Sequence, residues 1–380
     1  MLIGGVSLPM PLSLWLTRTV TGRAGHRAGL ALFGGFLLAG HLLIVASQVL
    51  GTGPLTEQVL LAARMVQGLG SGVLFQVRFV LASVSTNDRH VELQSQQFMM
   101  SDLGLGLGAL LPAAIAMLAG SRELKADAPE LLPSCVLAFI SLAYLMWVFV
   151  AFPQRLPVLP DRVRFPSKAA DSPLDVTKSA RSVSKVLLHA DRSLLIAWVS
   201  GTTRVFVQSA VLPAVALSMR EAHWTGNFRQ TYVCAALCLL PMPFEAFVSS
   251  LCCTCSVRAK GDGTSKSKMA YGLIGVVALV IASLTPRNVT GEDGEFLTLL
   301  ARICELAILM VALGMAAPFN ASQFYRHKDA ERSIVLLEWM KAYIGRLLGP
   351  FFAVATYTLV GYFPLLVVLS LATLLVGVTA

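Results

Sequence analysis

Long apolar segments alternate with short polar ones along the whole chain. Most of the apolar segments run for about 20 residues, which is the length a helix needs to cross the ~30 Å hydrocarbon core of a bilayer. We predict eleven membrane spans, at 1–17, 29–49, 57–82, 98–119, 133–153, 193–218, 230–251, 269–286, 296–320, 334–359 and 362–380. The pattern therefore predicts an all-α fold, that of a polytopic membrane protein.

The composition agrees with a membrane setting. Hydrophobic residues make up 56% of the chain and charged residues only 13%, with a mean hydropathy of +0.71. In a soluble domain roughly a quarter of the residues are charged. The net charge of +9 could indicate a nucleic-acid partner. We expect none, because the basic residues lie in loops at alternate ends of the spans.

The loop charges also predict the orientation of the chain. If the loop after the first span is cytoplasmic and the sides alternate, the cytoplasmic sides, counting the span ends, hold 20 Lys and Arg residues and the opposite loops hold 5. By the positive-inside rule, the C-terminus then lies in the cytoplasm. The N-terminus lies outside, which is unusual unless a further span precedes Met1. The pattern does not choose between the plasma membrane and a vacuolar or lysosomal membrane.

A proline-rich, basic stretch at 154–192 is the longest polar segment. It predicts a cytoplasmic linker between an N-terminal bundle at 1–153 and a C-terminal bundle at 193–380. The two parts also resemble each other, since the run ARMVQ at 63–67 is echoed by ARICE at 301–305. Internal repeats of this kind are typical of transporter folds.

Arg64 and Arg204 are two of the arginines that lie inside predicted spans. Arg64 lies about one helical turn before Gln67. It either faces a central cavity, where it binds an anionic group or responds to a moving proton, or has a structural role, bonded to carbonyl groups or to a carboxylate of a neighbouring helix. Arg204 lies about halfway along its span, and we place Thr203 and Gln208 on one face with it. A mid-membrane arginine is costly unless it is paired or hydrated. Arg204 is therefore our best candidate for contact with an anionic solute, with a structural ion pair as the alternative.

Glu245 and Glu305 are the candidate carboxylates inside predicted spans. Glu245 is nearer the cytoplasmic end of its span, where it could take up a coupling proton or form a salt bridge at a gate. Arg302 and Glu305 are three residues apart on one predicted helix. They either pair with each other or take part in solute binding and coupling.

Three motifs resemble those of the major facilitator superfamily. The run RMVQGLG at 64–70 is similar to the signature of its fourth helix. The run RAGHRAGL at 23–30 resembles the second half of the signature loop between helices two and three. The run GLGLGALLP at 104–112 is similar to the glycine-proline pattern of helix five. The order and spacing of all three motifs match that superfamily.

The resemblance implies two bundles of six helices. The eleven spans then correspond to helices two to twelve, and the first helix is absent from this chain. Arg204 falls in helix seven, which lines the cavity in that superfamily, and Arg23, Gly25 and Arg27 fall in the gating loop. Gly22 replaces an aspartate of the loop signature. The stretch at 64–89 most resembles the lysosomal and vacuolar branch, the relatives of major facilitator domain-containing protein 8.

The sequence thus predicts a secondary active transporter that moves a small solute by alternating access. Arg64 and Arg204 favour an anionic or polar organic solute, and protons are the expected coupling ion. The alternative is a truncated or divergent relative that does not transport and acts as a receptor or scaffold. We find no nucleotide motif, zinc spacing or acid–base cluster in the sequence. We therefore expect no cofactor, no metal and no enzymatic activity, and as partners only the solute and the lipid bilayer.

Overall fold

The computed structural model of the chain is helical. It describes residue 6 and residues 8–50, 53–84, 131–154, 192–221 and 340–379, with single positions within 93–115 and at 301, 305 and 309. All regular elements in these residues are helices, as predicted. The predicted spans 230–251 and 269–286, and nearly all of the predicted linker, lie outside the described residues. The chain divides into two compact units, 1–90 with 121–189 and 91–120 with 190–380.

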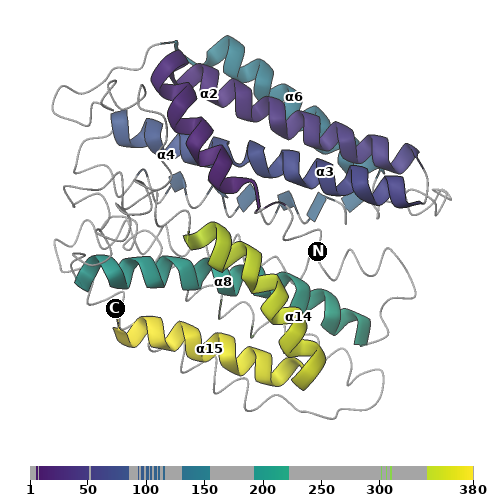
Figure 1. Cartoon of the computed structure of the whole chain (residues 1–380), viewed down its shortest axis with the longest axis vertical. Helices are drawn as coiled ribbons and strands as arrows, with labels where there is room; N and C mark the ends of the chain where they lie inside the picture. Colours follow the sequence, from purple (N-terminus) through teal and green to yellow (C-terminus); the bar gives the residue numbers. More distant parts are fainter. Residues whose placement is uncertain are drawn as a thin grey trace. The chain divides into compact units, whose positions relative to one another are not determined.

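Helix α2 (Met10–Val49) is the centre of the first unit. It packs against α3 (Pro54–Gly70), α4 (Gly72–Val84) and α6 (Leu131–Ala151). Figure 1 shows α2, α3 and α6 lying side by side. Helix α6 begins and ends within two residues of the span predicted at 133–153.

The sequence predicts a loop at 18–28, between the first two spans, and this prediction is wrong because the structure has helix over most of these residues. Helical structure continues on both sides, and within α2 only Gly25 departs from helical dihedral angles, with φ +82° and ψ 174°. That region is open almost exclusively to glycine. No proline lies in the predicted loop, so a single glycine makes the break. The span predicted at 57–82 is also divided, because Ser71 separates α3 from α4.

The second unit contains α8 (Arg192–Glu221), a π-helical segment η3 (Lys341–Leu347), α14 (Leu348–Val360) and α15 (Tyr362–Thr379). Helix α8 packs against η3, α14 and α15, and Figure 1 shows α14 crossing α8. A glycine again makes the turn between two helices, since Gly361 between α14 and α15 has φ +88°.

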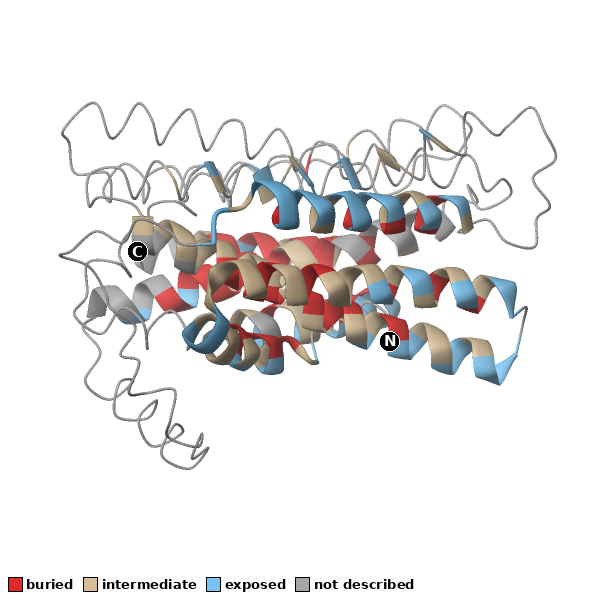
Figure 2. Ribbon diagram, turned by 90° about the horizontal axis from the view of Figure 1, so that it is seen from above, coloured by how far each residue is buried: buried red, intermediate tan, exposed pale blue. Residues whose placement is uncertain are grey.

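Many large apolar side chains of the described helices are exposed. On α6, Phe139 is 70% exposed and Val150 is 81% exposed, while its buried residues, such as Ala138 and Ser141, form one stripe. Figure 2 shows the same division between buried and exposed sides along the helices. Among the described residues, four helical stretches are long and apolar enough to cross a membrane: Thr19–Val49, Pro54–Arg78, Leu131–Ala151 and Tyr343–Val360. The exposed apolar faces are those that lipid would cover.

Candidate functional site

Arg64 and Gln67 belong to one hydrogen-bonded network between α3 and α2. Arg64 Nη1 donates to Gln67 Oε1 at 3.1 Å. The other end of the same amide, Nε2, lies 3.0 Å from Nδ1 of His41 on α2. Gln67 is only 7% exposed, so its two hydrogen bonds satisfy an amide that would otherwise be costly to bury. The structure therefore joins two predicted site residues to His41.

Close packing of glycines brings α3 to α2 at this network. A Cβ added to Gly40 of α2 would collide with the Gln67 side chain, and one added to Gly70 of α3 would lie 2.6 Å from Leu37 Cγ. One turn further along the pair, a Cβ on Gly72 would collide with the Phe33 ring. Small residues that let backbones approach are the usual packing device of membrane helices. The glycines after Arg64 thus have a packing role.

A second network of the same kind joins α2 to α4. Thr21 Oγ1 donates to Gln76 Oε1 at 2.7 Å, and Gln76 Nε2 lies 2.6 Å from His26 Nδ1. Gln76 is fully buried. In both networks a glutamine of the neighbouring helix accepts a hydrogen bond at Oε1 and faces a histidine of α2 with Nε2.

Sequence reasoning misses this second network. Gln76 is a lone amide within the apolar run VLFQV at 73–77. A single polar side chain in an apolar run indicates a buried hydrogen bond, and this was the signal that the sequence offered. An apolar helix gives no indication of which side faces a partner, however. The partner Thr21 lies in a stretch that we predict as loop. Only the packing of the helices brings Gln76, His26 and Thr21 together.

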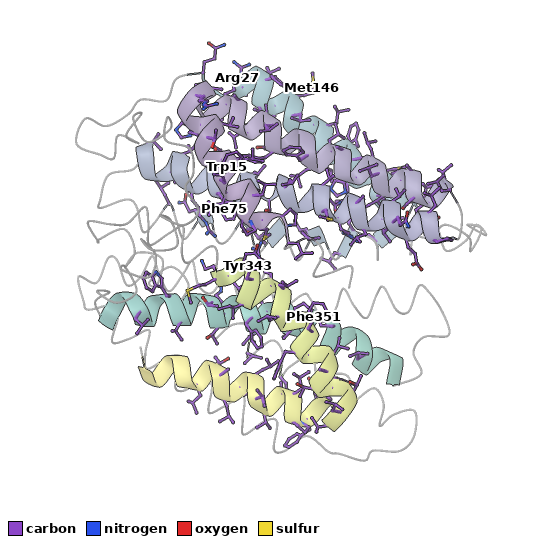
Figure 3. The ribbon with its side chains drawn as sticks, viewed as in Figure 1. Trp15, Arg27, Phe75, Met146, Tyr343 and Phe351 are labelled. Atoms are coloured by element: carbon purple, nitrogen blue, oxygen red, sulfur yellow. The ribbon has the colours of Figure 1, made fainter. Side chains whose placement is uncertain are left out.

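The predicted gating residues lie around the break in α2. Gly25 makes the break itself, and Arg23 is exposed just before it. Arg27 Nη2 donates to the carbonyl oxygen of Phe149, close to the C-terminal end of α6. The last carbonyl groups of a helix have no partner within the helix and carry partial negative charge. Arg27, labelled in Figure 3, therefore fastens α2 to the end of α6.

Helix α8 carries a cluster of buried polar side chains near its middle. Ser200 is 1% exposed, Thr202 is 5% exposed and Arg204 is 7% exposed. Gln208 lies one turn after Arg204. Arg204 belongs to this cluster, and the other two predicted site residues of α8, Thr203 and Gln208, are half-buried.

The predicted common face of these three residues is only partly right. Helix α8 is continuous from Arg192 to Glu221, so successive residues are turned by about 100°. Arg204 and Gln208 share a face. Thr203 is turned about 100° from Arg204 and lies on a different side.

Helix α8 is in close contact with η3 and the start of α14. A Cβ added to Gly345 would lie 2.7 Å from Val205 Cγ1, and one added to Gly349 would lie 2.7 Å from the Phe206 carbonyl oxygen. Ser209 Oγ also donates to the Gly345 carbonyl oxygen at 2.8 Å.

The π-helical segment η3 ends three residues before Pro350, which has no N–H group to donate within the helix. The Gly345 carbonyl oxygen accepts from the Leu348 N–H of its own chain segment and from the Ser209 hydroxyl on the neighbouring helix. In Figure 3, Tyr343 marks η3 and Phe351 marks the start of α14. Segments of π-helix are rare and frequently lie at functional sites.

Glu305 is the one carboxylate of the candidate set within the described residues. It is fully buried, and Tyr362 Oη at the start of α15 donates to its Oε2 at 3.4 Å. The ring of Tyr362 packs edge-on against Tyr357 of α14, with centroids 6.3 Å apart. Arg302 and Glu245 lie outside the described residues, so the pairing of Arg302 with Glu305 stays a prediction.

Comparison with known proteins adds one finding. No family model matches the sequence, and no curated protein matches it. The chain is similar to a crystal structure of the human organic anion transporter MFSD10 (TETRAN), with a TM-score of 0.64 and 17% sequence identity. The similarity covers 100% of this chain and 82% of that one. It confirms the predicted all-α, polytopic fold of the major facilitator type. The predicted likeness to the lysosomal and vacuolar branch, the relatives of major facilitator domain-containing protein 8, stays a prediction.

Proposed function

We propose, from the major facilitator fold, that the chain is a secondary active transporter of a small organic anion. The observation that carries this proposal is the buried position of Arg204, which is 7% exposed near the middle of α8. A guanidinium group inside the membrane is costly, and such residues usually mark a solute or ion pathway. The always-charged, planar guanidinium group suits carboxylate, sulfonate and phosphate groups. An anion is therefore the favoured solute class.

The structural neighbour supports the same class. It is described as an organic anion transporter, and the shared fold extends over this whole chain. At 17% identity the likeness does not transfer a solute, so the argument for an anion rests on Arg204.

The remaining candidate residues have supporting roles in this proposal. Arg64, held by Gln67, would stabilise the first unit and respond to charge in the pathway. The break at Gly25 would give the flexibility that alternating access needs. Glu305 would take up and release a coupling proton, because a fully buried carboxylate beside a tyrosine hydroxyl can exist in both protonation states during a transport cycle.

Uptake into proteoliposomes tests the proposal. The purified full chain would be reconstituted and given radiolabelled phthalate, naphthalene-2-sulfonate or phenyl phosphate, with tetraethylammonium as a cationic control. We expect uptake of at least one of the three anions and none of the cation. Arg204→Ala should reduce that uptake at least tenfold. Lys341→Ala, which removes another cation of the second unit, should leave it within twofold of the wild type.

Two results would contradict the proposal. If none of the three anions enters above the rate of protein-free liposomes, the non-transporting alternative stands. If Arg204→Ala transports as well as the wild type, Arg204 has no part in anion contact.

A further inference from the structure

We propose that Arg346 of η3 joins Arg204 and Gln208 of α8 in one binding site for the anionic group of the solute. This inference rests on the proposed transport function and adds a second guanidinium group to it. Helix α8 packs closely on the η3–α14 helix, and this packing places the three side chains.

The two helices run in parallel. Val205 contacts Gly345, and four residues later on both helices Ser209 contacts Gly349. The contacts advance in the same direction along both chains, which is possible only for parallel neighbours. Arg204 comes one residue before the first contact and Arg346 one residue after it. With a rise of 1.5 Å per residue, their Cα atoms differ by only ~3 Å along the helix axes.

The two arginines also lie on the same side of the helix pair. Both helices are right-handed; α8 turns by about 100° per residue, and the π-helical η3 turns in the same sense by somewhat less. In a parallel pair, a residue that directly precedes a contact residue on one helix lies on the same side of the pair as a residue that directly follows the contact residue on the other helix. Arg204 directly precedes Val205, and Arg346 directly follows Gly345. Gln208 follows Arg204 by one turn, so it lies on that side as well. Arg204 and Arg346 therefore share one side and nearly one level, and Gln208 lies on the same side about 6 Å further along α8.

The aromatic residues of the same pair provide an independent check. Phe206 directly follows the contact residue Val205 on α8, and Phe352 lies nearly one turn after the contact residue Gly349 on α14. By the same geometry, both rings should lie on the side of the helix pair opposite to the arginines. Their rings do meet, with centroids 5.3 Å apart. The α8–α14 pair thus has an aromatic side and a side with two guanidinium groups and an amide.

This arrangement suits an organic anion. Two guanidinium groups at one level raise the local positive potential, and low-dielectric surroundings strengthen it. A carboxylate, sulfonate or phosphate group can accept hydrogen bonds from both, and Gln208 can donate a further one. We infer that the bound group accepts from both arginines at once, so that each contributes to affinity.

The close contact of the helices fixes the position of Arg346. Gly345 and Gly349 have no room for a side chain against α8, and the Ser209 hydroxyl holds the Gly345 carbonyl group at 2.8 Å. Arg346 follows Gly345 directly. Ser209 is therefore a positioning residue for Arg346.

Equilibrium binding to the purified, detergent-solubilised full chain tests the inference without requiring transport. The probe is whichever of phthalate, naphthalene-2-sulfonate and phenyl phosphate the wild type binds most tightly. We expect Arg204→Ala and Arg346→Ala each to raise the Kd at least tenfold, and Arg346→Lys to recover part of the loss. The Kd of the double variant should rise by less than the product of the two single-variant factors, because one anion contacts both residues. Lys341→Ala, one turn earlier on η3, should change the Kd less than twofold.

Cross-linking tests the geometry separately. In a cysteine-free background, a short bis-methanethiosulfonate reagent should link Arg204→Cys to Arg346→Cys and should not link Arg204→Cys to Phe352→Cys. A wild-type Kd for Arg346→Ala, with loss of binding in Arg204→Ala, would overturn this inference and leave the proposed function standing. The reverse cross-linking pattern would also overturn it. If the wild type binds none of the three anions, both proposals fail.

Discussion

Gln67 of α3 and His41 of α2 are joined by a 3.0 Å hydrogen bond between Nε2 and Nδ1. Because Gln67 Oε1 already accepts from Arg64, its amide has one orientation, with Nε2 as the donor to His41. Nδ1 of His41 is therefore the acceptor, and His41 is the neutral tautomer with its proton on Nε2. The Gln76–His26 pair repeats this arrangement near the break in α2. Two amide–histidine pairs thus hold α2 to its neighbours.

The first prediction concerns this amide. Gln67→Leu leaves Arg64 and His41 without their partner, and we expect it to lower the free energy of unfolding by about 1 kcal/mol. Gln58→Leu on the same helix is the matched control, because Gln58 is exposed, and it should change stability by less than about 0.5 kcal/mol. Reversible unfolding of the detergent-solubilised protein in sodium dodecyl sulfate measures both. Equal effects of the two variants would contradict the structural role of Gln67.

The second prediction concerns the break in α2. A Cβ on Gly25 would meet no atom within 4 Å, and the same is true of Gly35. Of these two glycines, Gly25 alone has a positive φ. We expect Gly25→Ala to destabilise the protein by about 2 kcal/mol through backbone strain alone. Gly35→Ala should be neutral or stabilise it by up to about 1 kcal/mol.

The same unfolding assay decides between strain and crowding at Gly25. A loss of stability in both variants would mean that the space around α2, rather than the backbone angle, limits the residue at these positions. An unchanged stability of Gly25→Ala would mean that the break is not held by glycine.

The third prediction concerns the contact between α8 and η3. Ser209→Ala removes the donor to the Gly345 carbonyl group and should lower the free energy of unfolding by about 1 kcal/mol. Thr358→Ala is the control, since the Thr358 hydroxyl bonds only carbonyl groups of its own helix in the described contacts. Anion affinity should also fall in Ser209→Ala and stay unchanged in Thr358→Ala. If Ser209→Ala lowers the free energy of unfolding but leaves the anion Kd unchanged, Ser209 does not position Arg346 for the anion.

The fourth prediction concerns proton coupling. Glu305→Gln keeps the shape of a fully buried side chain but cannot release or take up a proton. We expect an inward proton gradient to stimulate anion uptake by the wild type and to have no effect on Glu305→Gln. Glu57→Gln, an exposed change in the first turn of α3, should respond as the wild type does. Stimulation retained by Glu305→Gln would assign the coupling to another group.

The sequence predicts a large part of this fold for a physical reason. Apolar segments of about 20 residues have few alternatives to membrane helices, and the glycines that follow Arg64 predict a close helix contact, which Gly70 and Gly72 make with α2. The extent of the loop before the second span was wrong, because charged residues such as Arg23 and Arg27 suggest a loop although their backbone is helical. Charge marks the membrane surface, not the end of a helix.

The site is less readable from the sequence. Arg204 stands out because charge is rare inside a span. Gln76, Ser209 and Tyr362 do not, since their roles come from partners on other helices: Gln76 contacts His26, and Ser209 contacts Gly345. Nothing in an apolar helix indicates which of its sides meets a neighbour. The side that Arg204 shares with Arg346 follows only from the helix contacts.

The most direct test of the central claim is counterflow of an organic anion across a liposome membrane. Proteoliposomes containing the full chain would be loaded with the unlabelled anion, chosen from the panel of three, and diluted into its radiolabelled form. Alternating access predicts rapid, transient accumulation of label far above the level in unloaded vesicles, and loss of that accumulation in Arg204→Ala but not in Lys341→Ala. Equal label in loaded and unloaded vesicles would contradict the transporter assignment.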